Sequence, residues 1–143
     1  MVVDPVRLKI NNCEAENALL TITANIREDF SNYTPDQLNN SPVAYFNNLK
    51  HTFDTLTEKD PVECRFMLVN NGKSDLVIRA VKPSCGCTAV RPEKSVLAPG
   101  DSTYINAFFH PEERIGEVKT GIKVVTNDPK LYKQYLWIEG YIK

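Results

Sequence analysis

Short alternating segments separated by turn signals fill the second half of the sequence and constrain its fold most strongly. Residues 62–69 (VECRFMLV), 103–109 (TYINAFF) and 135–142 (YLWIEGYI) alternate apolar and polar side chains, as strands with one buried face do. Turn-forming residues lie between such segments at 70–74 (NNGKS) and 97–102 (LAPGDS). Because strands and turns recur at intervals of about a dozen residues, the pattern predicts an antiparallel β-sandwich or barrel.

The alternation also predicts which side chains face the core. They are Val62, Cys64, Phe66, Leu68, Ile105, Ala107, Phe109, Leu136, Ile138 and Ile142. Between residues 62–69 and the apolar segment 75–81 (DLVIRAV) stands Asn71-Gly72, the strongest short-range cue for a hairpin. We therefore expect these two segments to pair as a hairpin, with Gly72 at a positive φ.

Residues 33–40 (YTPDQLNN) predict one short helix. Thr34 suits the capping position, Pro35 the first helical position, and Gln37 follows the cap by three residues, which is a capping box. Pro42 disfavours helix immediately before itself. Residues 27–42 are therefore interpreted as a linker that contains a short helix.

The first 26 residues resemble the end of the sequence. Leu20, Ile22, Ala24 and Ile26 align with Leu136, Ile138, Gly140 and Ile142 at an offset of 116 residues (142 − 26). A repeat at the spacing of one domain plus a linker indicates tandem domains, of which residues 1–26 would be the terminal hairpin of a preceding copy. The alternative is a chance similarity between two amphipathic strands, in which case Met1 is the native start.

The length of 143 residues fits one domain, or one domain with an appendage. With 17 basic and 18 acidic residues, the chain lacks the basic excess that binding of nucleic acid requires. The segment contains no apolar run long enough to span a membrane and no signal peptide. We expect no nucleic-acid partner and no membrane span in this segment.

The region from about residue 43 to 143 resembles the bacterial immunoglobulin-like domains of unknown function that are related to the ASPM/Hydin type. The resemblance rests on residues 66–90 (FMLVNNGKSDLVIRAVKPSCGCTAV), 97–111 (LAPGDSTYINAFFHP), 114–128 (RIGEVKTGIKVVTND) and 136–142 (LWIEGYI). It implies a sandwich of the seven-strand type, tandem copies, and a bacterial envelope or secreted protein. The family has a glycine after Phe53, where this chain has Asp54.

Cys85 and Cys87 in SCGCT, residues 84–88, are the most conspicuous candidates for chemistry. In an extended strand their Cα atoms would lie about 6.6 Å apart, at the edge of disulfide geometry. Redox pairs more commonly have C-x-x-C spacing at a helix start, and no helix is predicted here. The pair is interpreted as buried or half-buried thiols with a structural role, since cysteine packs as a small apolar residue.

Three alternatives for the cysteines remain open. They are a redox pair, a metal site that adds Cys64, His51 or His110, and a disulfide from Cys64 to Cys85 or Cys87. Against the metal site, Cys64, His51 and His110 do not form a second pair of ligands at the spacing that zinc sites use. Against the bridge, the expected hairpin places Cys64 opposite roughly Ala80 and not opposite Cys85.

The sequence shows no other catalytic constellation: neither a Ser/His/Asp order, nor H-E-x-x-H, nor a phosphate-binding glycine loop. Two groups of aromatic side chains are expected on outer faces, Tyr104 with Phe108 and Trp137 with Tyr135 and Tyr141. Such a stripe could bind a partner domain or a carbohydrate, or be covered by long side chains or by the linker.

These observations predict an all-β fold: an immunoglobulin-like antiparallel β-sandwich over residues 43–143, preceded by a linker with a short helix over 27–42 and by a β-hairpin over 1–26. We expect no enzyme, and no catalytic, cofactor or metal residues. The predicted function is a structural or protein-interaction module of a bacterial cell-envelope or secreted protein. Its partner would be a neighbouring immunoglobulin-like domain, or a second copy bound through the hairpin. The alternative is a thiol-based redox or metal-binding module that uses Cys85 and Cys87.

Overall fold

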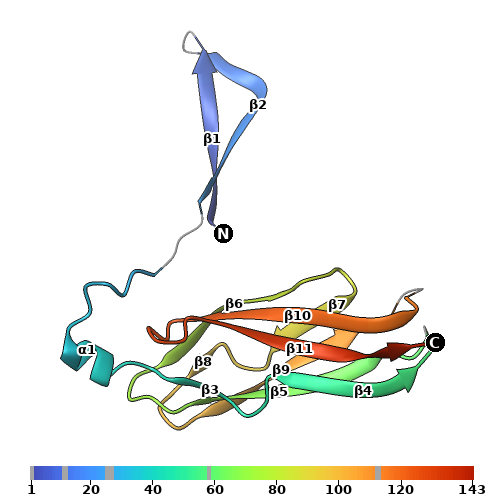
Figure 1. The fold of residues 1–143 in the computed structure, drawn as a ribbon. Coiled ribbons are helices and arrows are strands. Elements are labelled where there is room, and N and C mark those ends of the chain that lie inside the picture. Colours follow the sequence, from blue (N-terminus) through green and yellow to red (C-terminus); the bar gives the residue numbers. More distant parts are fainter. Residues whose placement is uncertain (1, 11–12, 25–27, 58, 112–113) are drawn as a thin grey trace. The chain divides into compact units, whose positions relative to one another are not determined.

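The computed structural model describes residues 2–10, 13–24, 28–57, 59–111 and 114–143. The chain forms two compact units, Met1–Asn32 and Tyr33–Lys143 (Figure 1). The described residues contain almost only strands, so the predicted fold class is confirmed. Each unit is considered by itself below.

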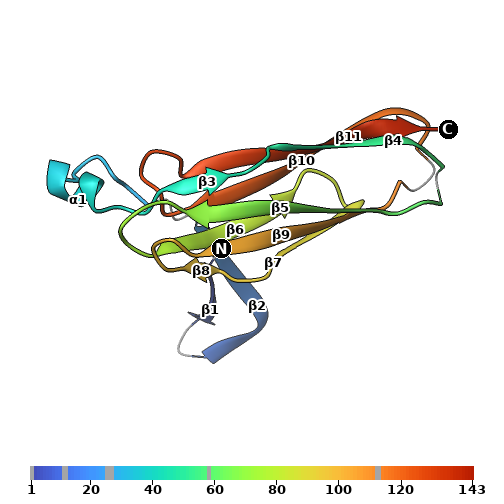
Figure 2. The ribbon, with the colours of Figure 1, turned by 90° about the horizontal axis from the view of Figure 1, so that it is seen from below.

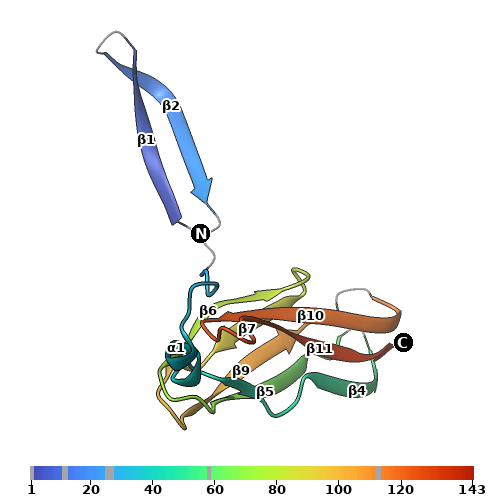
Figure 3. The same ribbon diagram turned by 60° about the vertical axis from the view of Figure 1, so that its left-hand side comes forward.

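The first unit is an antiparallel hairpin of β1 (Val2–Ile10) and β2 (Cys13–Ala24), seen side by side in Figure 3. Val2 pairs with Ala24 and Val6 with Leu20. The register shifts between Arg7 and Lys9, close to the tip. The predicted N-terminal hairpin is therefore present.

The second unit begins with the short helix α1 (Pro35–Asn39). Thr34 Oγ1 accepts a hydrogen bond from the Gln37 N–H at 3.3 Å, and Gln37 Oε1 accepts one from the Thr34 N–H at 2.8 Å. These two bonds form the predicted capping box, with proline at the first helical position.

Two sheets follow and pack face to face (Figures 1 and 2). One sheet has the order β3-β5-β9-β7, with β3 (Ala44–Phe46), β5 (Val62–Asn70), β9 (Ser102–Phe109) and β7 (Thr88–Pro92). The other has the order β4-β11-β10-β6-β8, with β4 (Lys50–Leu56), β11 (Lys133–Ile142), β10 (Gly116–Thr126), β6 (Leu76–Pro83) and β8 (Val96–Leu97). Strands β3-β5-β9-β7 facing β6-β10-β11 reproduce the A-B-E-D and C-F-G layers of an immunoglobulin-like sandwich.

The core lies between the sheets and contains the side chains that the alternation predicted. Phe66, Leu68, Ile105, Ala107, Phe109, Leu136, Ile138 and Ile142 are fully buried, and Val62 and Cys64 are nearly so. Because the inward faces of both sheets are apolar, each sheet buries its face against the other.

Strand β4 lies parallel to β11 at the edge of its sheet, and the register between them shifts by one residue near Asp54. The shift is a β-bulge, which forms here with Asp54 where the resemblance led us to expect a glycine. The Phe53 ring covers Gly140 of β11, where a Cβ would overlap the ring. Glycine on the neighbouring strand thus makes room for the bulged side chain.

The prediction of a hairpin at residues 70–74 is wrong. Strand β5 pairs with β3 and β9, whereas β6 pairs with β10 and β8, so NNGKS crosses from one sheet to the other. Gly72 does not have a positive φ; that conformation occurs at Gly100 and Gly116. Gly72 is needed for a different reason, because the backbone of Ser41, Pro42 and Val43 passes against it.

A buried asparagine fixes this crossing. The Asn70 side chain is fully buried, and its Nδ2 donates to the carbonyl oxygens of Ser74 and Leu97 at 2.8 and 2.9 Å. Its Oδ1 accepts the Gly72 N–H at 2.9 Å. The Asn70 amide therefore hydrogen-bonds backbone N–H and C=O groups at this crossing.

A buried aspartate closes the turn between β10 and β11. Asp128 is 1% exposed, and its Oδ1 accepts the N–H groups of Lys130 and Leu131 at 2.8 and 3.1 Å. Its Oδ2 accepts the Ala44 N–H at 2.8 Å, which ties this turn to the first strand of the opposite sheet.

Candidate functional site

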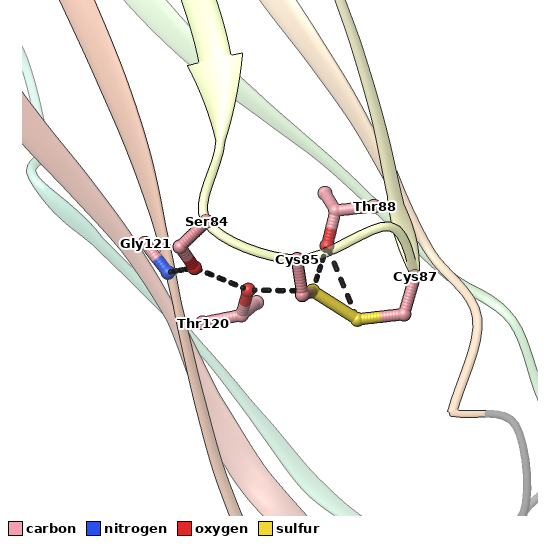
Figure 4. Close-up of a disulfide and its surroundings, with 6 residues drawn as sticks. All are labelled: Ser84, Cys85, Cys87, Thr88, Thr120 and Gly121. Atoms are coloured by element: carbon pink, nitrogen blue, oxygen red, sulfur yellow. Dashed lines mark hydrogen bonds between the residues drawn. A yellow bond between two sulfur atoms is a disulfide. The ribbon is translucent and has the colours of Figure 1, made fainter.

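SCGCT, residues 84–88, forms the turn that carries the chain from β6 in one sheet to β7 in the other. The interpretation of Cys85 and Cys87 as thiols in a strand is wrong, because a disulfide joins them (Figure 4). The physical reason is the turn at Gly86, which brings their Cα atoms to 5.4 Å instead of the extended-strand separation. That distance lies within the usual range for a bridge.

The two ends of the disulfide differ in exposure. Cys87 is 5% exposed and belongs to the core between the sheets, whereas Cys85 is half-buried and packs against the edge of that core. Gly86 between them is exposed. A reagent in solution therefore has better access to Cys85 than to Cys87.

Two threonine hydroxyls contact the sulfur atoms. Thr120 Oγ1 lies 3.3 Å from Cys85 Sγ, and Thr88 Oγ1 lies 3.5 Å from Cys85 Sγ and 3.9 Å from Cys87 Sγ (Figure 4). Both threonines are buried, at 2% and 3% exposure. Because a disulfide sulfur carries no proton, the hydroxyls are the donors in these contacts.

The direction of the neighbouring hydrogen bonds is also determined. The Gly121 N–H donates to Ser84 Oγ at 3.0 Å, and Ser84 Oγ lies 3.2 Å from Thr120 Oγ1 (Figure 4). The Cys85 sulfur can only accept, so Thr120 donates its single proton to Cys85 in their contact. Thr120 has no second proton to give, so its oxygen accepts from the Ser84 hydroxyl.

Sequence reasoning found only part of this site. Cys85 and Cys87 stand out in the sequence, and Ser84 and Thr88 flank them, although no role was assigned to these hydroxyl groups. Thr120 lies on β10, and it follows Cys85 by 35 residues in the sequence. Its contact depends on the pairing of β6 with β10, for which the sequence carries no local signal.

The disulfide contributes little to fold stability through chain entropy. It closes a loop over a sequence separation of two, and the entropy that a cross-link removes from the unfolded chain grows with loop size. The same relation gives about 1.6 kcal/mol for a three-residue loop and about 3 kcal/mol for a 15-residue loop. The disulfide is therefore expected to add little to the free energy of unfolding, although it lies where the chain crosses between the sheets.

Cys64 is a free, buried thiol on β5, paired with Ala107 of β9. It does not face Ala80, because β5 and β6 belong to different sheets. The bridge from Cys64 to Cys85 or Cys87 is therefore not formed. Burial raises the pKa of the Cys64 thiol to about 11, and the nearby Glu63 carboxylate adds to the shift.

Raising the pH from about 9 to 11 should reduce the stability that Cys64 contributes. An unfolded cysteine ionises near pH 8.5, whereas folded Cys64 keeps its proton to about pH 11. Between these values the unfolded state binds fewer protons, so the free energy of unfolding falls as the pH rises, by at most about 1.4 kcal/mol per pH unit from this group. In urea unfolding at pH 8, 9 and 10, the advantage of the native chain over Cys64→Ala should shrink. An advantage that stays constant would contradict the assignment.

The outer face of β10 and β11 carries aromatic and charged side chains. The Tyr135 and Trp137 rings stack with their centroids 6.1 Å apart, and Lys119 Nζ lies 4.7 Å from the Trp137 ring centroid. Trp137 covers Gly121 on the neighbouring strand. Tyr135 and Tyr141 are 42% and 47% exposed, as predicted. Trp137 is half-buried, with the Tyr135 ring and Lys119 packed against it.

A carboxylate joins the lysines of this face. Glu139 Oε1 lies 2.8 Å from Lys119 Nζ, and its Oε2 lies 3.1 Å from Lys50 Nζ. Hydrogen bonds from Lys119 and Lys50 hold the pKa of Glu139 below its ordinary value. The network holds Lys119 close to the Trp137 ring.

The second predicted aromatic pair, Tyr104 and Phe108, lies on the outer face of the other sheet, at 41% and 37% exposure. Tyr104 pairs with Met67, and Phe108 pairs with Glu63 on the neighbouring strand. The polar Arg65–Asn106 pair separates the two aromatic side chains, so this face has no continuous stripe.

Within the described part of the chain, no group of His, Cys, Asp and Glu side chains is arranged to hold a metal ion. His51 lies on β4 and His110 follows β9, in opposite sheets. The described residues also include no helix that is long and apolar enough to cross a membrane.

The model of DUF1573, a family described as proteins of unknown function, matches residues 44–142. The chain belongs to the DUF1573 family. No curated protein matches its sequence.

Several solved structures resemble this DUF1573 chain. A protein of unknown function from Porphyromonas gingivalis W83 has a TM-score of 0.66 at 15% identity, over 79% of this chain and 51% of that one. The ASH / PapD-like domain 7 of human CEP192 has a TM-score of 0.54 at 14% identity, over 85% and 98%. The VesB protease of Vibrio cholerae has a TM-score of 0.55 at 10% identity, over 70% and 31%.

At these identities the likeness shows the fold alone, which is an immunoglobulin-like sandwich. The DUF1573 chain spans about half of the Porphyromonas gingivalis protein and about a third of VesB. The similarity to VesB therefore does not bring protease activity to this domain.

Proposed function

We propose that the DUF1573 sandwich is a non-enzymatic structural and protein-interaction module in a tandem array of immunoglobulin-like domains. The observation that carries the proposal is the register of the N-terminal hairpin. Val2 pairs with Ala24 and Val6 with Leu20 in β1–β2, and Val118 pairs with Gly140 and Ile122 with Leu136 in β10–β11. Each pair is related to its counterpart by the offset of 116 residues.

This agreement supports an origin of residues 1–26 as the last hairpin of a preceding copy, with residues 43–143 as the following copy. In an antiparallel hairpin one matching pair fixes its neighbours, so the matching pairs amount to one agreement in register. A chance similarity between two amphipathic strands need not produce this agreement. The differences are confined to the tip, where β1–β2 has its register shift. Loops and tips are where repeats vary most.

The proposed location is the bacterial cell envelope or the extracellular space. The Cys85–Cys87 disulfide supports it, because disulfides persist in oxidising compartments such as the periplasm and are rare in the cytosol. The relation to the ASPM/Hydin type belongs to the same proposal. It rests on the resemblance of residues 66–90.

The proposed partner is another immunoglobulin-like domain or a second copy of this chain, bound through the hairpin. An isolated two-stranded hairpin is marginal in water, so β1–β2 gains stability from a surface to pack against. Its strands also have free edges that can pair with another chain. The outer face of β10–β11, with exposed Tyr135 and Tyr141, offers the amphipathic aromatic side chains that are enriched at interfaces.

Sedimentation velocity of residues 1–143 and 29–143 from 10 µM to 1 mM tests this proposal. We expect the full chain to self-associate as its concentration rises and residues 29–143 to remain monomeric. In the full chain, Tyr135→Ser with Tyr141→Ser should weaken the association several-fold, whereas Tyr45→Ser on the other sheet should leave it unchanged. A full chain that remains monomeric throughout would contradict self-association through the hairpin.

A further inference from the structure

Backbone hydrogen bonds hold the SCGCT turn independently of its disulfide. The Ser84 N–H donates to the Gly121 carbonyl oxygen at 2.8 Å, and the His110 N–H donates to the Cys87 carbonyl oxygen at 2.9 Å. One end of the turn is thus tied to β10 and the other to the residue that follows β9. Neither of these hydrogen bonds depends on the sulfur–sulfur bond, so we expect the backbone of the turn to be kept when the disulfide is reduced.

The sulfur atoms also have an environment suited to a thiolate. Thr120 and Thr88 both donate toward Cys85 Sγ, and Thr88 lies near Cys87 Sγ as well. Because the single Thr120 proton goes to the sulfur, the Thr120 oxygen accepts from Ser84, whose own oxygen accepts the Gly121 N–H. Donors that make only weak contacts to a disulfide make much stronger ones to a thiolate, because the acceptor is then charged.

We propose that Cys85–Cys87 is a reversible thiol–disulfide site that exchanges with an external dithiol. This role goes beyond an interaction module and needs no enzyme activity of the domain. The sequence argued against a redox pair because no helix N-terminus follows the cysteines to stabilise a thiolate. In the structure, threonine hydroxyls provide that stabilisation instead. The short loop, the ordered turn and the half-buried Cys85 all favour exchange.

The exchange proceeds in two balanced steps. A thiolate of the external dithiol attacks the accessible Cys85 Sγ, which breaks the Cys85–Cys87 bond and leaves Cys87 as a thiolate near the Thr88 hydroxyl. The second thiolate of the dithiol then attacks its own sulfur in the mixed disulfide. Cys85 leaves as a thiolate that Thr120 and Thr88 stabilise. Each protein thiolate takes a proton from solvent as its pKa dictates, and two electrons pass from the dithiol to the protein.

Titration of the folded full chain with dithiothreitol at pH 8 tests the proposal. Reduced and oxidised forms are counted by alkylation and mass spectrometry, and circular dichroism follows the fold. We expect reversible reduction of Cys85–Cys87 without unfolding, while buried Cys64 stays unmodified as an internal control. A pair that stays oxidised until the protein unfolds, or a fold that is lost on reduction, would overturn the proposal.

Two variants separate the role of the hydroxyl from that of packing. Thr120→Val keeps the shape but removes the donor, and it should lower the equilibrium constant for reduction roughly threefold to tenfold. Thr103→Val, at another buried threonine, should leave that constant unchanged. Equal constants for Thr120→Val and the native chain would show that the hydroxyl does not stabilise a thiolate. Should Thr120→Val fail to fold, the reversibility of the native pair still decides the proposal.

Discussion

Replacing Asp128 by alanine should lower the free energy of unfolding by about 3–5 kcal/mol, because three backbone N–H groups lose their acceptor. Asp128 is 1% exposed and accepts from Lys130, Leu131 and Ala44. Water cannot readily replace a buried carboxylate at these positions. The loss would loosen both the β10–β11 turn and the first strand of the opposite sheet.

Urea unfolding followed by circular dichroism measures this effect, with Asp101→Ala as the matched control. Asp101 makes a largely exposed ion pair with Lys94, so its loss should cost no more than about 0.5 kcal/mol. Asp128→Asn should fall between the two, since an amide retains one acceptor oxygen. If Asp128→Ala is as stable as Asp101→Ala, the hydrogen bonds of this carboxylate do not hold the turn.

Replacing Gly72 by valine should destabilise the sandwich by about 3 kcal/mol through overpacking. A Cβ at this position would lie 2.5 Å from the Pro42 Cα and from the Ser41 carbonyl oxygen, both of which are backbone atoms that cannot turn away. Gly72→Ala should therefore already cost about 2 kcal/mol.

Gly86→Ala is the matched control, because a Cβ there meets no atom within 4 Å. It should change the free energy of unfolding by less than about 0.5 kcal/mol. The same urea experiment compares the three variants. A neutral Gly72→Ala would mean that the linker before β3 does not pass against the crossing.

The sequence predicted the strands because their alternation is a local property. Phe66, Ile105 and Leu136 each belong to a set of apolar side chains at every second position of one strand. The buried face can therefore be assigned without knowing which strand pairs with which. The capping box at Thr34 is local as well, since its two hydrogen bonds join residues three apart.

The errors arose where long-range contacts decide the structure. Asn71-Gly72 has the composition of a hairpin turn, yet Asn70 is bonded to Leu97, 27 residues away, and the chain crosses between sheets. Similarly, spacing alone suggested that Cys85 and Cys87 lie in a strand, whereas the turn between two sheets brings them together. Both features depend on strand pairing, which joins residues that are far apart in the sequence.

The division of the chain into a preceding hairpin and a complete sandwich is most directly tested by deleting residues 1–28. The remaining residues 29–143 contain both sheets, helix α1 and the Asp128 and Asn70 networks. We predict that they unfold cooperatively in urea, with a free energy of unfolding within about 1 kcal/mol of the full chain and the same slow amide exchange in β10 and β11. Loss of cooperative unfolding, or rapid exchange in these strands, would show that residues 1–26 supply part of the same domain.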